Sequence, residues 1–348
     1  MQTHRWIEGS GDYAAALLIR KKVFMEEQGY SEEMEIIPQE DHASLHLVLY
    51  EDGEPVACGR LMPDKRPHVL HAGRIAVLKE KRGTGLGKTI VELLTQKAKE
   101  LGAEEVIIGA QEYAVPFYQK CGYVPCSVEY MDGHIPHVTM AHTFALDGIG
   151  FLGFNDCPEA VLFRRDFTVP VQVRRATLRL LPLGFCEGYL NGKRISEDLY
   201  APAWSNYVPQ DFSHMNYPIH DTMCSRAYYL QYDVTDFIHK GQNALALHIG
   251  DGWFGQWESR NEGVHRYGEK KLCYRLTVED EDGNAHEFTS SDGGKYCTSF
   301  VKRTSMYFGE RQDLRTYSRS LLTAPTVEPC WKDAVPVDAP DTLIVRQT

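Results

Sequence analysis

The spacing of apolar residues changes near residue 145, and this change constrains the fold more than any other feature of the 348-residue chain. Before it, apolar residues recur at helical spacing in some stretches and in short runs in others, which predicts a mixture of helices and strands. After it, helical spacing largely disappears, and short alternating runs are separated by turns rich in glycine and asparagine. We therefore predict two domains, which agrees with a prior of about 150 residues per domain.

The first part of the chain contains the clearest helix. Apolar residues follow helical spacing over residues 86–101, and Gly102 favours an end there because glycine readily adopts the left-handed conformation that closes a helix. The other predicted elements are helices over residues 14–28 and 115–120 and strands at residues 46–50, 56–61, 74–78 and 106–108. A turn containing Asp52-Gly53 joins the first two strands into a predicted hairpin.

The second part of the chain is typical of an all-β domain. Asn191-Gly192 lies between two short runs and suits the tight turn of a hairpin. Residues 273–279 alternate between apolar and polar, and Asp282-Gly283 turns the chain back into another strand. Many short strands with such turns predict a β-sandwich. A segment at residues 144–158, rich in glycine and aspartate, is predicted to link the domains.

Composition excludes several classes of function. The net charge is −11, and both parts of the chain are acidic, which argues against a dedicated nucleic-acid binder. No apolar run approaches the ~18 residues of a membrane-spanning helix, and the polar N-terminus does not read as a signal peptide. The nine cysteines are scattered and contain no C-x-x-C pair, which favours free thiols over a zinc site or disulfide framework. We expect a cytoplasmic protein without metal, nucleic-acid or membrane partners.

A glycine-rich segment lies between the predicted strand at 74–78 and the predicted helix at 86–101. It reads Arg82-Gly83-Thr84-Gly85-Leu86-Gly87-Lys88. Glycines let the backbone approach a ligand, and a helix N-terminus offers free N–H groups and partial positive charge, so the segment suits a pyrophosphate. Its spacing fits neither a P-loop nor a dinucleotide-binding fingerprint. A tight loop without a ligand is the alternative.

At this point the sequence resembles the GCN5-related N-acetyltransferase (GNAT) superfamily, whose pyrophosphate motif Q/R-x-x-G-x-G/A is matched by Arg82, Gly85 and Gly87. A second family pattern, A-x-x-F-Y-x-K-x-G-F, is matched by Ala114, Phe117, Tyr118, Lys120 and Gly122, with Tyr123 in the last position. Gln111 stands where the family usually has asparagine. Residues 23–28, Asp41, His46 and residues 133–140 further resemble the ElaA/YjcF-type branch, with His134 as an extra residue.

This resemblance covers residues 1–143 and implies an α+β fold, in which helices flank a mixed central sheet. It also implies direct transfer of an acetyl group from acetyl-CoA to an amine. A backbone N–H that is freed where the strand around Ala76 splays from its neighbour would polarise the thioester carbonyl. The residues expected to bind acetyl-CoA are Ile75, Ala76, Val77, Arg82, Gly83, Thr84, Gly85, Leu86, Gly87, Lys88 and Gln111.

The acid and base of the reaction follow from the same resemblance. Tyr118 stands where the family places the acid, and a phenol with a pKa of ~10 is protonated at neutral pH. The base is left open among His137, His46, Glu27 and Glu112, with His137 and Tyr118 as the assigned catalytic pair. Glu27, Gln28 and His46 are expected to contact the acceptor. Structural roles for these side chains are the alternative.

The second part is similar to the N-terminal β-sandwich of bacterial α-L-rhamnosidases of glycoside hydrolase family 78. The matching strings are Leu190-Asn191-Gly192-Lys193-Arg194, Tyr232-Asp233-Val234-Thr235-Asp236 and Gly250-Asp251-Gly252-Trp253-Phe254. The resemblance implies a jelly-roll-like sandwich over residues 159–348. It does not include the helical catalytic barrel, so glycoside hydrolysis is not expected. Trp253 and Trp257 are the best candidates for stacking on a sugar, with burial in the core as the alternative.

Together these patterns predict an acetyl-CoA-dependent N-acetyltransferase joined to a carbohydrate-binding-like domain. The amine acceptor is expected to be a small molecule, with an amino sugar or glycan-linked amine recruited by the sandwich as one hypothesis. A non-catalytic protein that binds acyl-CoA and carbohydrate is the alternative. In a third interpretation the sandwich serves only as a spacer or in oligomerisation.

Overall fold

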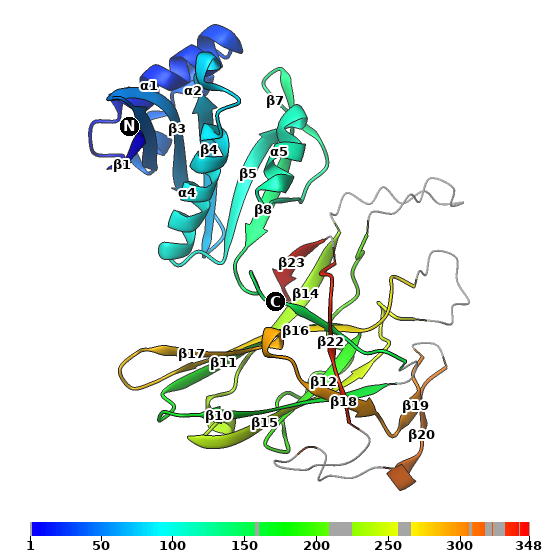
Figure 1. The fold of residues 1–348 in the computed structure, drawn as a ribbon. Coiled ribbons are helices and arrows are strands. Elements are labelled where there is room, and N and C mark those ends of the chain that lie inside the picture. The colour runs from blue at the N-terminus through cyan, green and yellow to red at the C-terminus, as the bar shows by residue number, and fades with distance from the viewer. Residues whose placement is uncertain are drawn as a thin grey trace, which may run out of the picture. The chain divides into compact units, whose positions relative to one another are not determined.

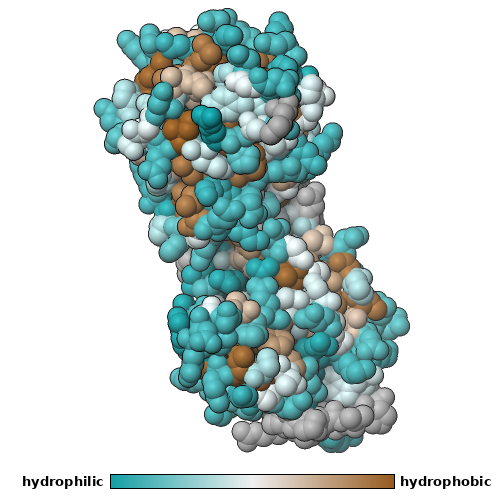
Figure 2. Space-filling view, turned by 60° about the vertical axis from the view of Figure 1, so that its left-hand side comes forward, coloured by the Kyte–Doolittle hydropathy of each residue, from teal (hydrophilic) through white to brown (hydrophobic). Residues whose placement is uncertain are grey.

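The computed structural model divides the chain into two compact units (Figure 1). It describes residues 2–156, 160–208, 225–256, 266–305, 308–316, 322, 331–340 and 342–347. The first unit comprises residues 2–145, and the second comprises the described residues from Leu146 onward. Within these ranges no helix is long and apolar enough to cross a membrane. The face of the protein in Figure 2 is largely hydrophilic, and its apolar residues form small separate patches.

The first unit is built on an eight-stranded sheet of order β1-β2-β3-β4-β5-β8-β6, with β7 paired to β8. Its strands are β1 (Gln2–Glu8), β2 (Leu45–Glu51), β3 (Glu54–Pro63), β4 (Val69–Val77), β5 (Glu105–Gln111), β6 (Val124–Pro125), β7 (Tyr130–Asp132) and β8 (Ile135–Thr143). Only β4 and β5 pair in parallel among these strands. A parallel pair needs a crossover connection, and α4 (Leu86–Glu100) provides it.

Helices cover both faces of this sheet. On one face α4 buries Ile90 and Leu94 against β3, where a side chain at Gly59 would come within 2.8 Å of Leu94. On the other face α1 (Ala14–Arg20) buries Ala16 and Ile19. The remaining helical elements are the π-helix η1 (Lys21–Glu27), α2 (Glu32–Glu35), α3 (Pro38–His42), α5 (Val115–Lys120) and the 3₁₀ turns η2 (Lys79–Lys81) and η3 (Glu112–Ala114).

Strands β4 and β5 diverge partway along their length. Their pairing runs from Val69 with Glu105 to Ala72 with Ile108. Strand β4 then continues to Val77, paired on its other side with β3. On that side Cys58 pairs with Ala76 and Arg60 with Gly73, so one residue of β3 faces two of β4 in a β-bulge. The divergence opens a space at the carboxyl ends of β4 and β5.

The second unit is a sandwich of two principal sheets. One has the order β13-β12-β15-β10-β18-β21, and the other has the order β22-β9-β16-β11-β14-β23 with β17 paired to β16. The strands are β9 (Phe151–Gly153), β10 (Val161–Val169), β11 (Arg175–Leu183), β12 (Phe185–Leu190), β13 (Lys193–Arg194), β14 (Arg226–Asp233), β15 (Gly241–Gly250), β16 (Lys271–Glu279), β17 (Ala285–Thr289), β18 (Lys295–Thr298), β21 (Lys332–Asp333), β22 (Val335–Val337) and β23 (Leu343–Arg346). A separate hairpin joins β19 (Val301–Arg303) and β20 (Arg311–Gln312).

The core of the second unit lies between these two sheets. Phe163 and Leu247 come from one sheet, Leu178 and Leu276 come from the other, and all four belong to one buried cluster. The α+β fold and the β-sandwich predicted from the sequence are both confirmed. Strand β9 lies inside the segment predicted as a linker and pairs with β16 and β22.

Candidate functional site

A cavity of about 600 Å³ occupies the first unit where β4 and β5 diverge. Strands β4, β5 and β8 line it together with η1 and α5. The residues expected from the sequence that line this cavity are Gln28, Ile75, Ala76, Val77, Arg82, Gly87, Gln111, Tyr118 and His137. The expected residues outside the lining are Glu27, His46, Gly83, Thr84, Gly85, Leu86 and Lys88. Chain segments far apart in the sequence therefore meet at one space.

The glycine-rich segment forms a tight loop into α4. Gly83 and Gly85 have φ angles of +79° and +92°, which residues with side chains rarely adopt. Gly85 is the N-cap of α4, so the first N–H groups of the helix have no partner within it. At Gly87 a side chain would come within 3.4 Å of the Phe117 ring. Backbone conformation therefore favours glycine at positions 83 and 85, whereas a Cβ at position 87 would only make ordinary contact with Phe117.

Arg82 is already bound by other groups of the protein. Its Nη1 and Nη2 donate to the two carboxylate oxygens of Glu27 at 2.6 and 2.8 Å. Its Nε donates to the carbonyl oxygen of Val77 at 3.1 Å. These hydrogen bonds lower the pKa of Glu27 and raise that of Arg82. Glu27 is therefore an ionised partner of the loop arginine, a pairing that the sequence did not predict.

Tyr118 lies on α5 with its side chain 8% exposed. Burial, with a contribution from Tyr123, raises the pKa of Tyr118 far above its usual value, so the phenol keeps its proton at neutral pH. The hydroxyl of Tyr123 shares a hydrogen bond of 2.7 Å with Thr95. Within the described part of the chain the Tyr118 hydroxyl makes no such bond, and it faces the cavity as an available donor.

His137 lies on β8 beside Gln111 of β5 and is 6% exposed. Its Nδ1 is 2.9 Å from the carbonyl oxygen of Ile135. A carbonyl oxygen only accepts, so Nδ1 carries the hydrogen, and Nε2 of the neutral ring is an acceptor. Gln111 in turn donates to the side-chain oxygen of Gln28 at 3.0 Å. These residues connect the end of η1, where Gln28 is the C-cap, with β5 and β8 around the cavity.

The other candidates for the base lie elsewhere. His46 is 1% exposed, stacks on Tyr13 with ring centroids 4.3 Å apart, and approaches the carbonyl oxygen of Asp41 at 2.9 Å. Burial lowers the pKa of His46, which keeps the ring neutral in the core. Glu112 is exposed on η3 and does not line the cavity. Of the four candidate bases, His137 is therefore the one that lines the cavity.

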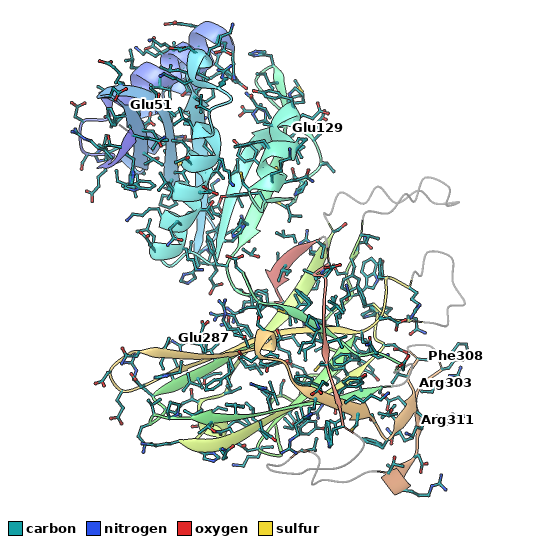
Figure 3. All side chains as sticks on the ribbon, in the orientation of Figure 1. Glu51, Glu129, Glu287, Arg303, Phe308 and Arg311 are labelled. Atoms are coloured by element: carbon teal, nitrogen blue, oxygen red, sulfur yellow. The ribbon has the colours of Figure 1, made fainter. Side chains whose placement is uncertain are left out.

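The second unit has a cavity of about 510 Å³ whose lining includes Phe185, Glu187, His248 and Glu310. Trp253 is half-buried and packs edge-on against Phe185, with ring centroids 6.3 Å apart. Trp257 lies outside the described residues. The hairpin of β19 and β20 lies beside this cavity, and there Arg303 covers the Phe308 ring at 5.8 Å, near Arg311 (Figure 3). No group of three metal-ligating side chains occurs among the described residues.

Comparison with known proteins gives two family matches. The acetyltransferase (GNAT) domain matches residues 12–144, and the alpha-L-rhamnosidase N-terminal domain matches residues 171–348. The uncharacterized N-acetyltransferase YjcF of Bacillus subtilis is 39% identical over 126 residues, which are 36% of this chain and 88% of YjcF. An alpha-L-rhamnosidase of Streptomyces avermitilis is 32% identical over 157 residues, which are 44% of this chain and 13% of that enzyme.

The chain belongs to the GNAT acetyltransferase family in its first part and to the alpha-L-rhamnosidase N-terminal domain family in its second. It spans only 13% and 15% of the two curated rhamnosidases, so the second similarity concerns one domain of those proteins. Among solved structures, Escherichia coli ElaA aligns at 23% identity and a TM-score of 0.38, covering 41% of this chain and 99% of ElaA. The rhamnosidase of Dictyoglumus thermophilum aligns at 20% identity and a TM-score of 0.49, covering 61% and 24%.

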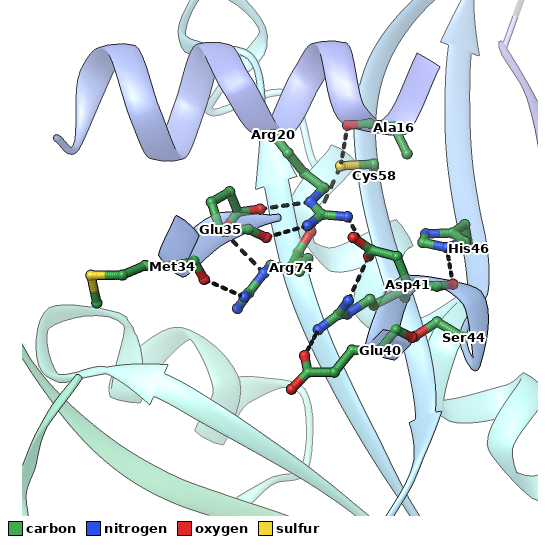
Figure 4. A network of polar contacts seen from close by, with 11 residues as sticks. Ala16, Arg20, Met34, Glu35, Glu40, Asp41, Ser44, His46, Cys58 and Arg74 are labelled. Carbon is green, nitrogen blue, oxygen red and sulfur yellow. Dashed lines mark hydrogen bonds and ion pairs between the residues drawn. The ribbon is translucent and has the colours of Figure 1, made fainter. Parts of the chain in front are cut away.

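One wall of the GNAT cavity rests on a buried charge network that sequence reasoning missed (Figure 4). Arg20 binds Glu35 and Asp41 through contacts of 2.6 Å each. Arg60 binds the same oxygen of Asp41 and a carboxylate oxygen of Glu40, again at 2.6 Å. A sequence signal did exist, because Arg20 shares the buried face of α1 with Ala16 and Ile19.

The network holds α2 and α3 against the sheet. Burial by itself would raise the pKa of Asp41, but the guanidinium groups of Arg20 and Arg60 outweigh it and lower that pKa. Burial raises the pKa of Glu35 even though Arg74 and Arg20 oppose the shift. Because Glu35, Glu40 and Arg60 also line the cavity, the same contacts that anchor these helices shape its wall.

We predict that Asp41→Asn destabilises the GNAT domain by about 3–5 kcal/mol, because it leaves two buried guanidinium groups without their shared carboxylate. The folded pKa of Asp41 is lowered, so its stabilisation is present above the unfolded pKa of ~3.9 and is lost as pH falls through the folded value. Hydrogen exchange of β2 and β3 in urea, followed at several pH values, measures the difference.

Asp64→Asn is the control, because Asp64 pairs with the half-exposed Arg66 at 3.1 Å. Such a surface pair contributes about 0–1 kcal/mol. Equal protection of β2 and β3 in both variants at neutral pH would contradict the structural role of Asp41.

Proposed function

We propose that the GNAT domain transfers an acetyl group from acetyl-CoA to a small-molecule amine bound in the cavity of the first unit. One observation carries the proposal: Arg82 before α4, Gly87 in the first turn of α4, the diverging end of β4 and Tyr118 all border one space. This combination provides an anion-binding helix N-terminus, unpaired backbone groups and a proton donor.

Acetyl-CoA supplies the activated acetyl group as a thioester. Backbone N–H groups from Gly83 to Lys88 would hold the pyrophosphate, because they lie at the N-terminus of the 15-residue helix α4. The edge of β4 at Ile75, Ala76 and Val77, which has left β5, would hydrogen-bond the pantetheine amides and polarise the thioester carbonyl. Gln111 borders the same edge from β5.

Two side chains would move the protons of the reaction. Nε2 of His137 would accept the proton that the attacking amine loses, directly or through one water. Tyr118 would donate its proton to the departing sulfur as the new C–N bond forms and the C–S bond breaks. Burial favours the role of Tyr118, since it keeps the phenol protonated.

We also propose that the rhamnosidase-type domain recruits a carbohydrate that carries the amine. The cavity beside Phe185 and Glu187 supports this, because it offers an aromatic ring and a carboxylate to a sugar. An acceptor screen should therefore begin with amino sugars. An upward shift of thermal unfolding by acetyl-CoA, without release of CoA for any amine, would favour a non-catalytic binding protein.

We predict that Tyr118→Phe retains acetyl-CoA binding but lowers turnover on the order of 100-fold, because the thiolate loses its proton donor. Binding is measured by the thermal shift with acetyl-CoA, and turnover by release of free thiol. Tyr123→Phe is the matched control, since its hydroxyl is bound to Thr95 and does not line the cavity. Unchanged turnover in Tyr118→Phe would exclude it as the acid.

We predict that His137→Gln also lowers turnover, and that the deficit shrinks as pH rises toward the pKa of the acceptor amine, ~10.4 for a lysine-like amine. Above that pH the amine arrives already deprotonated and needs no base. The control is His142→Gln, because His142 lies on the same strand as His137 but outside the cavity lining, with its Nδ1 bound to the carbonyl oxygen of Gly122. A deficit that is constant with pH would indicate a positioning role instead.

We predict that Glu27→Gln tightens acetyl-CoA binding several-fold at low salt, because it removes a negative charge and releases Arg82 for the pyrophosphate. This increase in acetyl-CoA affinity should become smaller in ~0.5 M salt, because electrostatic interactions are then screened over a few ångströms. S-acetylpantetheine, which lacks the pyrophosphate, should bind both proteins equally.

The neighbouring exposed residue offers a control, Glu26→Gln, with the same change of charge and no bond to Arg82. If Glu27→Gln weakens both ligands by the same factor, the pair between Glu27 and Arg82 serves instead to hold the cavity wall.

A further inference from the structure

Arg74 occupies the β-bulge of β4 and lines the cavity. Its φ angle is +51°, in the left-handed region that residues with side chains seldom adopt. Such strain persists only where the surrounding structure fixes it, and it is concentrated at functional sites. A bulge also re-aims the side chains of its strand. The guanidinium of Arg74 is therefore a candidate ligand-binding group of the cavity.

The contacts of Arg74 leave part of its guanidinium available (Figure 4). Nε lies 3.0 Å from a carboxylate oxygen of Glu35, and Nη2 donates to the carbonyl oxygen of Met34 at 3.1 Å. Nη1 makes no hydrogen bond to any described residue. The side chain is 24% exposed, so this nitrogen can be reached from the cavity.

The carboxylates of the charge network are shared unequally among Arg20, Arg60 and Arg74. Arg20 and Arg60 each bind two carboxylates, whereas Arg74 has one oxygen of Glu35, a carboxylate that Arg20 also uses. Burial, together with the positive charges of Arg60 and Arg20, lowers the pKa of Arg74 although Glu35 opposes the shift. The surroundings of Arg74 are therefore short of negative charge, and an anion placed there would be stabilised.

We propose that the acceptor amine carries an anionic group, a carboxylate or a phosphate, which Arg74 binds through Nη1. The proposal rests on the proposed function and defines the class of acceptor for the same cavity. The lining also contains the carboxylates of Glu40 and Asp132, which suit the ammonium form of the incoming amine. The cavity thus offers both signs of charge to an acceptor that carries both.

The test uses pairs of amines that differ by one anionic group. Tyrosine and tyramine differ by a carboxylate, and glucosamine 6-phosphate and glucosamine differ by a phosphate. Titration calorimetry of the full chain saturated with CoA measures the affinity ratio within each pair. We expect the anionic member of at least one pair to bind on the order of 10- to 100-fold tighter, as a charge-assisted hydrogen bond provides. The pair that shows this preference identifies the anion.

Three variants then assign the preference to Arg74. Arg74→Met removes the charge and keeps much of the volume, and it should bring the ratio close to one. Arg74→Gly should also bring the ratio close to one. Because glycine adopts the left-handed conformation at this position without strain, this variant controls for loss of the ratio through misfolding. Arg74→Lys should retain part of the preference. Arg66→Met, at an arginine that does not line the cavity, should leave the ratio unchanged.

Two results would overturn the proposal. One is equal affinity for both members of each pair in the unmodified protein, and the other is a ratio that survives in both Arg74→Met and Arg74→Gly. Because the readout is binding, it remains decisive if no amine is acetylated, a result that would refute the proposed function alone.

Discussion

The divergence of β4 and β5 beyond Ala72 and Ile108 is the constraint on which the rest of the GNAT domain depends. Parallel strands that stayed paired would leave no space between their carboxyl ends. Because β4 instead stays with β3 through a bulge, its edge toward β5 is left open, and a cavity forms there. Helix α4 begins at one side of this opening, and Tyr118 and His137 reach it from α5 and β8. Every proposed step of acetyl transfer uses that opening.

A second constraint is the burial of charge along one cavity wall. Placing Arg20 and Asp41 in the core is costly unless their charges are paired, and contacts with Glu35 and Arg60 provide that pairing. Both arginines share Oδ1 of Asp41, and its Oδ2 has no hydrogen-bond partner among the described residues. The same pairing leaves Arg74 with a smaller share of negative charge. Structural stability and acceptor recognition are thus coupled in the proposal, because the carboxylates that anchor α2 and α3 also set the potential inside the cavity.

The sequence predicted some elements well and missed others for identifiable reasons. The helix at residues 86–101 and the hairpin at 46–61 have strong apolar patterns, and both are present as α4 and as β2 with β3. Strand β1 was missed because it is an edge strand with mostly exposed, polar residues. The helix expected over residues 14–28 changes at Lys21 into the π-helix η1, which ends at Glu27 with Gln28 as its C-cap. Apolar spacing does not predict this change.

The sequence by itself determined the two fold classes, their order and the glycine-rich loop, because these depend on local spacing and on glycine's access to left-handed conformations. Only the tertiary structure decided which side chains meet. It joined Glu27 to Arg82 across 55 positions, placed His46 in the core rather than in the cavity, and directed Arg74 into the cavity. Such pairings depend on strand order and on the bulge in β4. Both features arise from long-range packing, which local sequence patterns do not predict.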